Sequence, residues 1–187
     1  MKYVLFNRSG SNELFLTIIK SLCGESKDIS MIDLCCNEAT MTRQLNFKER
    51  TYVDVRDCDV GEEQQYFVQA DVLGEHEVFN RHYDVAFCLD GIEHLSYQDG
   101  LKLLERMERI STRQILFTPL GDYQVESNNN DPCCHKSGWR PLILPGGWAA
   151  IELPQYHESL DIGAFFFWKA PSIEEDFLRV VEELRTL

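Results

Sequence analysis

The fold of this chain is decided by the segment Tyr83-Asp-Val-Ala-Phe-Cys-Leu-Asp-Gly-Ile-Glu-His-Leu95, in which acids and a histidine directly follow a short apolar run. Such a run is typical of a parallel strand that is covered on both faces. Asp90, Glu93 and His94 would then lie beyond the carboxyl end of the strand, where open α/β sheets bind their ligands. A second interpretation is a solvent-facing helix that begins at Asp90, because acids favour the first turn of helices.

Strand and helix patterns alternate on both sides of that run. Strands are predicted over residues 30–34, 51–55, 66–69, 85–89, 114–118, 149–153 and 164–168. Helices are predicted over residues 39–45, 97–110 and 173–187, and over an apolar stripe from Leu14 to Leu22 that Gly24 would end. The second of these helices should turn Leu101, Leu104 and Met107 inward. This alternation predicts an α/β fold with a Rossmann-like, doubly wound, seven-stranded and mostly parallel sheet.

The length and the hydrophobic content suit a single domain over residues 1–187. With 187 residues and 44% hydrophobic residues, the chain can bury about 70% of its unfolded surface in one core. The stretch 121–148 contains Asn128-Asn-Asn-Asp-Pro132 and Pro145-Gly-Gly147, which are rich in residues that break regular structure. It therefore predicts a long surface loop, and long loops in compact domains are often functional.

The charge balance restricts the class of partner. Lys and Arg total 18 against 31 Asp and Glu, a formal net charge of −13, and no dense basic cluster offsets it, so nucleic acid is disfavoured as a partner. No run is long and apolar enough to cross a bilayer, and no signal peptide is recognisable. We expect a cytoplasmic protein with a small-molecule or protein substrate and no membrane partner; the sequence does not indicate an oligomeric state.

The seven cysteines argue against a disulfide framework and against a structural zinc site. Their number is odd and none forms a Cys-x-x-Cys pair. Most of them should be small buried hydrophobes. The aromatic residues Trp148 and Phe165 to Trp168 should likewise belong to the core, because no basic residues surround them as in a base-stacking platform.

Several motifs together resemble the class I S-adenosylmethionine-dependent methyltransferases, in particular small members that contain Glu-His-Leu. Ile32-Asp-Leu-Cys-Cys-Asn-Glu-Ala39 resembles the family's first strand and cofactor loop, and Ile92-Glu-His-Leu95 the ending that follows its fourth strand. Further similar segments are Tyr52-Val-Asp-Val55, Val68-Gln-Ala-Asp-Val72, Phe117-Thr-Pro119, His135-Lys-Ser-Gly-Trp139 and Gly163-Ala-Phe-Phe-Phe-Trp-Lys169. The resemblance implies an antiparallel last strand and a capping loop at about 121–148.

The resemblance also implies cofactor-binding roles for Asp33, Cys35, Asn37, Asp54, Asp71 and Asp90. Asp54 follows Asp33 by 21 residues, close to the spacing of the ribose-binding acid in dinucleotide-binding folds, and an ionised carboxylate accepts two hydroxyl hydrogen bonds. Asp71 would contact adenine. Either acid can instead be an ordinary turn residue.

The first loop departs from the family pattern. Cys35, Asn37 and Ala39 stand where the family has glycines, which permit a positive φ and a close approach of the ligand. Asn37 tolerates the left-handed region, whereas Cys35 adds a side chain along the path of the cofactor. The loop therefore either binds the cofactor in an altered form or has lost it.

His94 is the first candidate for a general base, and Glu93 and His135 are the other catalytic candidates, because a histidine titrates near neutral pH. Each histidine can instead be structural, with His135 belonging to a loop that packs Trp139 over the pocket. We assign no metal ligand, although Asp90, Glu93, His94 and His135 would suit a divalent metal. This set resembles the metal cluster of small-RNA and quinone-biosynthesis O-methyltransferases, with Asp90 in place of their usual Glu.

The sequence therefore predicts a methyltransferase that uses S-adenosylmethionine on a small molecule or a side chain. The first alternative is a catalytically inactive, methyltransferase-like partner or regulatory protein with a degenerate cofactor loop. Another is a lyase that uses the same cofactor. DNA amino-group methylation is disfavoured, because Asp90-Gly-Ile-Glu93 lacks the Pro-Pro-aromatic motif of those enzymes.

Overall fold

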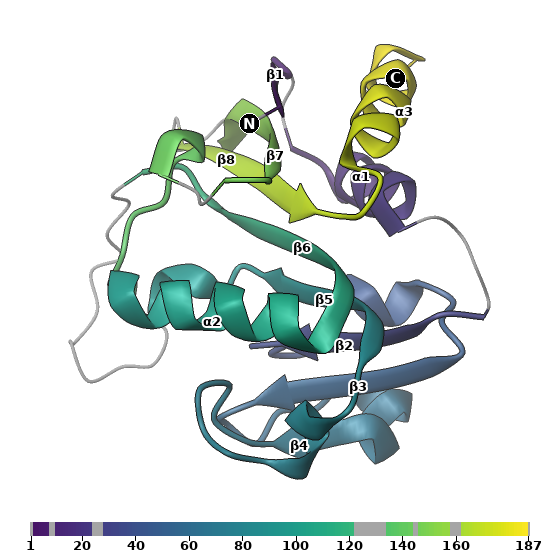
Figure 1. Ribbon diagram of the computed structural model, residues 1–187, viewed down its shortest axis with the longest axis vertical. Coiled ribbons are helices and arrows are strands. Elements are labelled where there is room, and N and C mark those ends of the chain that lie inside the picture. The colour runs from purple at the N-terminus through teal and green to yellow at the C-terminus, as the bar shows by residue number, and fades with distance from the viewer. Residues whose placement is uncertain are drawn as a thin grey trace.

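The structure, a computed structural model, describes residues 2–7, 10–23, 28–121, 134–143, 146–157 and 162–186. One mixed sheet forms its centre (Figure 1). Its strands are β1 (Lys2–Leu5), β2 (Ser30–Leu34), β3 (Glu49–Asp54), β4 (Phe67–Gln69), β5 (Tyr83–Leu89), β6 (Ser111–Pro119), β7 (Ala149–His157) and β8 (Ile162–Lys169). The helices are α1 (Asn12–Cys23), α2 (Tyr97–Ile110) and α3 (Ile173–Thr186).

The strand order places a switch point between β2 and β5. The order is β1-β7-β8-β6-β5-β2-β3-β4, and every neighbouring pair is parallel except the two that involve β8. After β2 the chain continues outward to β3, and after β5 it continues the other way to β6. Ligands of doubly wound sheets bind outside the carboxyl ends of the strands at such a point. The predicted fold class and the antiparallel last strand are confirmed.

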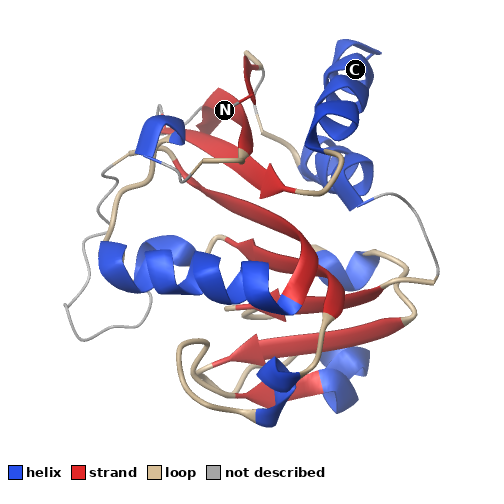
Figure 2. Ribbon diagram, in the orientation of Figure 1, coloured by secondary structure: helices blue, strands red, loops and turns tan. Residues whose placement is uncertain are grey.

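Helices cover both faces of the sheet (Figure 2). One apolar cluster joins α1 and α3 to the sheet, and its centre is the contact of the Phe15 ring with the rings of Phe117 and Phe166, each at 4.8 Å between centroids. The other cluster joins α2 to the opposite face. In β8, Phe166 belongs to the first cluster and Phe167 to the second, as the period of two in a strand requires. The predicted core aromatics, Trp148 and Phe165 to Trp168, are buried.

Three details differ from the sequence prediction. β1 is an eighth strand that was not predicted; it is four residues long and alternates between half-buried and exposed. The predicted helix over 39–45 is wrong, because the chain forms only a short 3₁₀ turn at Thr42–Gln44. In α2, Leu103 is fully buried together with Leu104 and Met107, whereas Leu101 is half-buried.

Some predictions fall outside the described residues. These are the helix stop at Gly24, the breaker segment 128–132 and half of the predicted capping loop, residues 122–133 and 144–145. Among the described residues, no helix is both long enough and apolar enough to span a membrane.

Candidate functional site

A cavity of about 300 Å³ opens at the switch point, beyond the ends of β2, β3 and β5. Both its acidic residues and its apolar walls come from the loops that follow these strands and β4. Its lining residues are Cys35, Asn37, Asp54, Val55, Arg56, Asp71, Val72, Asp90, Gly91, His94, Leu95 and Lys136. Its size lies at the lower end of the range of about 300–1,000 Å³ that is usual for small-molecule sites.

The loop after β2 adopts a backbone that glycine would favour, although it contains no glycine. Cys35, Asn37 and Ala39 have φ angles of 58°, 47° and 51°. These are the three positions at which the resemblance to the methyltransferase family led us to expect glycines. A left-handed backbone costs an L-residue about 1–2 kcal/mol, so the surrounding contacts must hold the loop in this form.

Hydrogen bonds to β3 hold this loop. The amide of Cys36 donates to the carbonyl of Val53 at 3.1 Å. The amide of Asn37 donates to Asp54 Oδ2 at 3.0 Å. Within the loop, the Ala39 amide donates to the Cys36 carbonyl at 2.7 Å. The end of β3 therefore sets the position of the loop.

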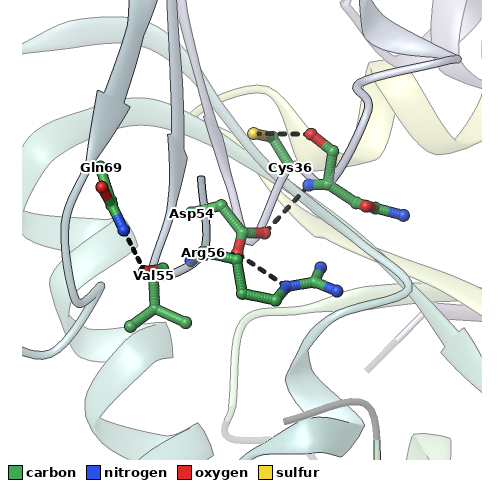
Figure 3. Close-up of polar contacts among 6 residues, drawn as sticks. Cys36, Asp54, Val55, Arg56 and Gln69 are labelled. Atoms are coloured by element: carbon green, nitrogen blue, oxygen red, sulfur yellow. Dashed lines mark hydrogen bonds and ion pairs between the residues drawn. The ribbon is translucent and has the colours of Figure 1, made fainter. Parts of the chain in front are cut away.

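Asp54 is the centre of this arrangement (Figure 3). Its carboxylate is 4% exposed, and its Oδ1 accepts from the Arg56 amide at 2.9 Å and from the Arg56 Nε at 3.2 Å. A carboxylate accepts about four hydrogen bonds, so the contacts with Asn37 and Arg56 leave little capacity for a ligand. The Arg56 side chain is 39% exposed and is the partner that a ligand hydroxyl would displace most readily.

Asp33 lies behind the loop and does not line the cavity. It is 3% exposed, its Oδ2 accepts from the Thr42 hydroxyl, and its Oδ1 has no hydrogen-bond partner in the part of the chain that the structure describes. Burial raises the pKa of Asp33 to about 7, and the nearby Asp54 contributes in the same direction. Asp33 is therefore partly protonated at neutral pH.

One wall of the cavity combines an acid with apolar side chains. Asp71 accepts a hydrogen bond from the Leu73 amide at 2.9 Å, so it is a turn residue as well as a lining residue. Val55 is 56% exposed, an unusual exposure for a valine, and it lines the cavity together with Val72 and Leu95. This wall suits a flat, largely apolar group with a polar edge.

Asp90 and Glu93 form a coupled acidic pair after β5. Asp90 has a φ of 61°, and its amide donates to the Phe117 carbonyl at 2.9 Å, so the chain turns sharply here instead of beginning a regular helix. Glu93 is 2% exposed and accepts from the Thr118 hydroxyl at 3.0 Å. Burial, followed by the charge of Asp90, raises the pKa of Glu93. A protonated Glu93 can donate to the Asp90 carboxylate, which would satisfy Glu93 Oε1, an atom without another partner among the described residues.

The two candidate histidines lie next to each other. The His94 and His135 rings meet edge to face with 5.0 Å between centroids, and the His94 Nδ1 lies 3.4 Å from the Cys134 carbonyl oxygen. Burial lowers the pKa of His94, so this imidazole is neutral at physiological pH. Ligand atoms of Glu93, His94 and His135 all lie within 4.8 Å of one another.

The segment around His135 is anchored by the core. The amides of Lys136 and Ser137 donate to the Glu93 carbonyl, and the Trp139 indole donates to the Ser137 hydroxyl at 2.9 Å. Trp139 is fully buried and its ring lies 5.1 Å from that of Tyr97 in α2. The interpretation that Trp139 packs over the pocket is therefore wrong, because it packs in the core.

The structure brings together Cys35, Asn37, Asp54, Asp71, Asp90 and His94 around the cavity. Asp33, Glu93 and His135 are not among its lining residues, and Asp90 does not belong to the Glu93–His94–His135 cluster. Asp122 and Tyr123, which follow β6 closely enough to be further candidates for the lining, lie outside the described residues. Sequence reasoning missed Val55 and Arg56, although both directly follow the acid at the end of a predicted strand.

Comparison with known proteins supports the fold. No family model matches the chain, and no curated protein sequence matches it significantly. Among solved structures, it is similar to the N-methyltransferase NodS from Bradyrhizobium japonicum in complex with S-adenosylhomocysteine, with a TM-score of 0.61, 13% identity and coverage of 87% of this chain and 89% of that chain. It is also similar to the methyltransferase domain of bacterial CtHen1, with a TM-score of 0.56, 19% identity and coverage of 84% and 98%.

A third similar structure is magnesium protoporphyrin IX methyltransferase from Synechocystis with bound S-adenosylhomocysteine. The TM-score is 0.58 at 12% identity, with coverage of 85% of this chain and 84% of that chain. At these identities the likeness establishes the methyltransferase-type Rossmann fold alone.

Asn37 offers a direct test of the loop backbone, because its side chain is exposed and its φ is 47°. We expect Asn37→Val to lower the free energy of unfolding by about 1–2 kcal/mol relative to Asn37→Gly, since a branched side chain is strained in the left-handed region. Urea denaturation measures the difference. Glu38→Val, at the neighbouring exposed position, is the control. Equal stability of the valine and glycine variants at position 37 would show that the loop backbone is not left-handed there.

Asp33 should make the folded state less stable as the pH rises. Its pKa of about 7 in the folded state lies above the value of about 3.9 in an unfolded chain. The folded state therefore binds more protons than the unfolded state between about pH 4 and 7, and stability falls across this window. We expect Asp33→Asn to remove up to about 4 kcal/mol of this fall, measured by urea denaturation at pH 5, 6, 7 and 8. Parallel profiles of the two proteins would contradict the raised pKa.

Proposed function

We propose that this protein is an S-adenosylmethionine-dependent methyltransferase that acts on a small molecule or on a protein side chain. The observation that carries the proposal is the loop after β2. Cys35, Asn37 and Ala39 keep a left-handed backbone without glycine, and the loop donates an amide to Asp54 beside the cavity. A strained backbone of this kind persists where the surrounding structure holds it, and such strain clusters at ligand sites. The bound S-adenosylhomocysteine in similar folds supports the same reading.

The residues of the cavity fit the cofactor. Asp54 would accept the ribose hydroxyls after the Arg56 side chain turns away, and Asp71 would accept the adenine amino group between the apolar side chains of Val55 and Leu95. Cys35 and Asp90 would face the methionine part. Carboxylates at this end of the cavity also oppose the positive charge of a sulfonium. When bound, the cofactor supplies a methyl group that is already activated for transfer.

The protein then has to align an acceptor and remove its proton. Alignment supplies most of the rate in such a reaction. We assign proton removal to His94, since it lines the cavity and its lowered pKa keeps it neutral and ready to accept. Burial and the charge of Asp90 raise the pKa of Glu93, so Glu93 would hold Asp90 in place rather than act as the first base. His135 would orient His94 through the ring contact.

Two alternatives use the same fold. A methyltransferase-like partner protein would retain the loop but not bind the cofactor, whereas a lyase would bind the cofactor and cleave it. Titration of the protein with the cofactor distinguishes the first alternative, and analysis of the products distinguishes the second.

Replacement of Asp54 tests the proposal. We expect wild-type protein to bind S-adenosylhomocysteine in isothermal titration and Asp54→Ala to bind it at least tenfold more weakly, because a buried charged acceptor is lost. Asp57→Ala is the matched control, since Asp57 is an exposed acid three residues further along that does not line the cavity. Absence of binding by the wild type would favour the partner protein, and equal affinities of the two variants would remove Asp54 from the site.

A second candidate is a methyltransferase that holds its acceptor through a divalent cation. The observation in its favour is the cluster of Glu93, His94 and His135, whose ligand atoms lie within 4.8 Å of one another. Glu93 Oε1 has no partner other than Asp90 among the described residues, so an ionised Glu93 can offer it as a ligand. Three protein ligands would leave positions open for acceptor oxygens. A cation would compete with the proton on Glu93, so its affinity should rise with pH.

Binding of Mn²⁺ tests this candidate without an assay of methyl transfer. We expect Mn²⁺ to bind more tightly at pH 8 than at pH 6. Electron paramagnetic resonance of the free ion measures this binding. His135→Ala should weaken this binding at least tenfold, whereas His82→Ala, at an exposed histidine at the start of β5, should leave it unchanged. Binding that is equal in both variants would exclude the cluster as the metal site.

A further inference from the structure

Two thiols meet beneath the cavity. Cys35 follows β2 and lines the cavity, and Cys88 belongs to the neighbouring strand β5. The Cys35 and Cys88 side chains hydrogen-bond to each other. Both thiols are free among the described cysteines. The contact joins the loop that we assign to the cofactor with the strand that carries Asp90.

Gly91 makes this close contact possible. A Cβ at position 91 would lie 2.7 Å from Cys35 Cβ, 3.1 Å from Cys88 Sγ and 3.5 Å from Cys35 Sγ. Both sulfur atoms therefore lie around one small space that any side chain at position 91 would fill. The lack of a side chain at Gly91 leaves nothing between the two thiols.

The strand register also suits a covalent link. Asp33 lies opposite Phe87 in the parallel β2–β5 pair, so Cys88 comes one residue after this pair on β5 and Cys35 two residues after it on the β2 side. Neighbouring strands lie about 4.8 Å apart, and cysteines joined by a disulfide have their Cα atoms about 4.4–6.8 Å apart. The left-handed backbone at Cys35 (φ 58°) turns its side chain toward the apolar cluster that contains Cys88.

The two thiols differ in access. Cys88 is fully buried, whereas Cys35 is half-buried and reaches the cavity. The contact with Cys35, followed by burial, raises the pKa of Cys88. An oxidant that enters the cavity would therefore meet Cys35 first, with Cys88 behind it as the second thiol.

We propose that Cys35 and Cys88 form a reversible redox modification site that controls access of the cofactor to its loop. This rests on the proposed function in so far as the loop binds S-adenosylmethionine. The chemistry needs a two-electron oxidant of the peroxide class. Hydrogen peroxide oxidises the Cys35 thiol to a sulfenic acid and is reduced to water. The Cys88 sulfur then attacks the Cys35 sulfur, the S–S bond forms, the S–O bond breaks, and the thiol proton leaves with the hydroxyl as a second water.

The link would change the loop that holds Asn37. A disulfide brings the two sulfur atoms to about 2.05 Å, well inside the contact distance of two thiols, and so draws Cys35 toward β5. Asn37 lies two residues further on, and its amide contacts Asp54. Oxidation therefore moves the loop away from the geometry that supports Asp54 and weakens cofactor binding. By reciprocity, bound cofactor shifts the equilibrium between the disulfide and the two thiols toward the thiols.

The first measurement maps the link itself and is independent of the cofactor. Reduced protein is treated with a small excess of hydrogen peroxide, blocked with N-ethylmaleimide and digested with trypsin. Trypsin releases Cys35 and Cys36 in one peptide, residues 28–43, and Cys88 in the peptide of residues 82–102. The Cys36→Ser variant therefore makes the assignment of the disulfide to Cys35 unambiguous. We expect a 28–43 to 82–102 disulfide that dithiothreitol removes. A link to Cys58 instead, or no link, would overturn the proposal.

The second measurement compares binding of S-adenosylhomocysteine before and after oxidation. The dissociation constant should rise at least tenfold on oxidation of the wild type and return with dithiothreitol. Cys88→Ala, or Cys88→Ser if the alanine variant does not fold, should show no such rise. If the oxidised protein contains the disulfide but binds S-adenosylhomocysteine with unchanged affinity, the proposal that oxidation controls cofactor binding is overturned. If the reduced wild type does not bind S-adenosylhomocysteine at all, the proposed function is contradicted. The disulfide mapping would still show whether Cys35 and Cys88 react with each other.

Discussion

The hydrogen bond from the Asn37 amide to the Asp54 carboxylate is the contact on which the candidate site depends. It joins the loop after β2 to the end of β3 at 3.0 Å. The acceptor is an almost fully buried carboxylate, and hydrogen bonds to charged groups are worth about 1.5–3 kcal/mol each. That amount is comparable to the cost of one or two left-handed residues. A loop without glycine can therefore keep a shape that usually requires glycine, provided that the acid stays in place.

The charge of the candidate site depends more on the burial of its acidic residues than on the composition of the whole chain. The chain has a net charge of −13, yet burial raises the pKa values of Asp33 and Glu93, and Asp54 is paired with Arg56. Two acids beside the cavity are thus partly neutralised by burial, and Asp54, which lines it, is paired with Arg56 before any ligand arrives. A cationic ligand would favour the ionised forms of these acids, so their pKa values depend on what the site binds.

Strong local patterns made much of the fold predictable. The buried strands β2 and β5 and the amphipathic helix α2 were recognisable because each has a clear period and clear ends, and the topology followed from their alternation. β1 was missed although Tyr3-Val-Leu5 is apolar, because a run this short does not distinguish a strand from a helix. The helix over 39–45 was predicted from its residue types, but the positive φ of Ala39, which tertiary contacts impose, stops helix formation there.

The candidate site was predictable mainly where an acid or a histidine lies at the end of a predicted strand or shortly after it. Asp54, Asp71, Asp90 and His94 meet this condition and line the cavity, and the family resemblance added Cys35 and Asn37. The burial of Glu93 and the position of His135 depend instead on the loop that follows β6. The most informative departure from the expected pattern is Cys35. If the Cys35 side chain did nothing but occupy a position where the family has glycine, it would only weaken cofactor binding. Its contact with Cys88, in a space that Gly91 keeps open, gives the same side chain a partner. The strain of the loop and the pairing of the thiols thus have one origin, the left-handed backbone at residue 35.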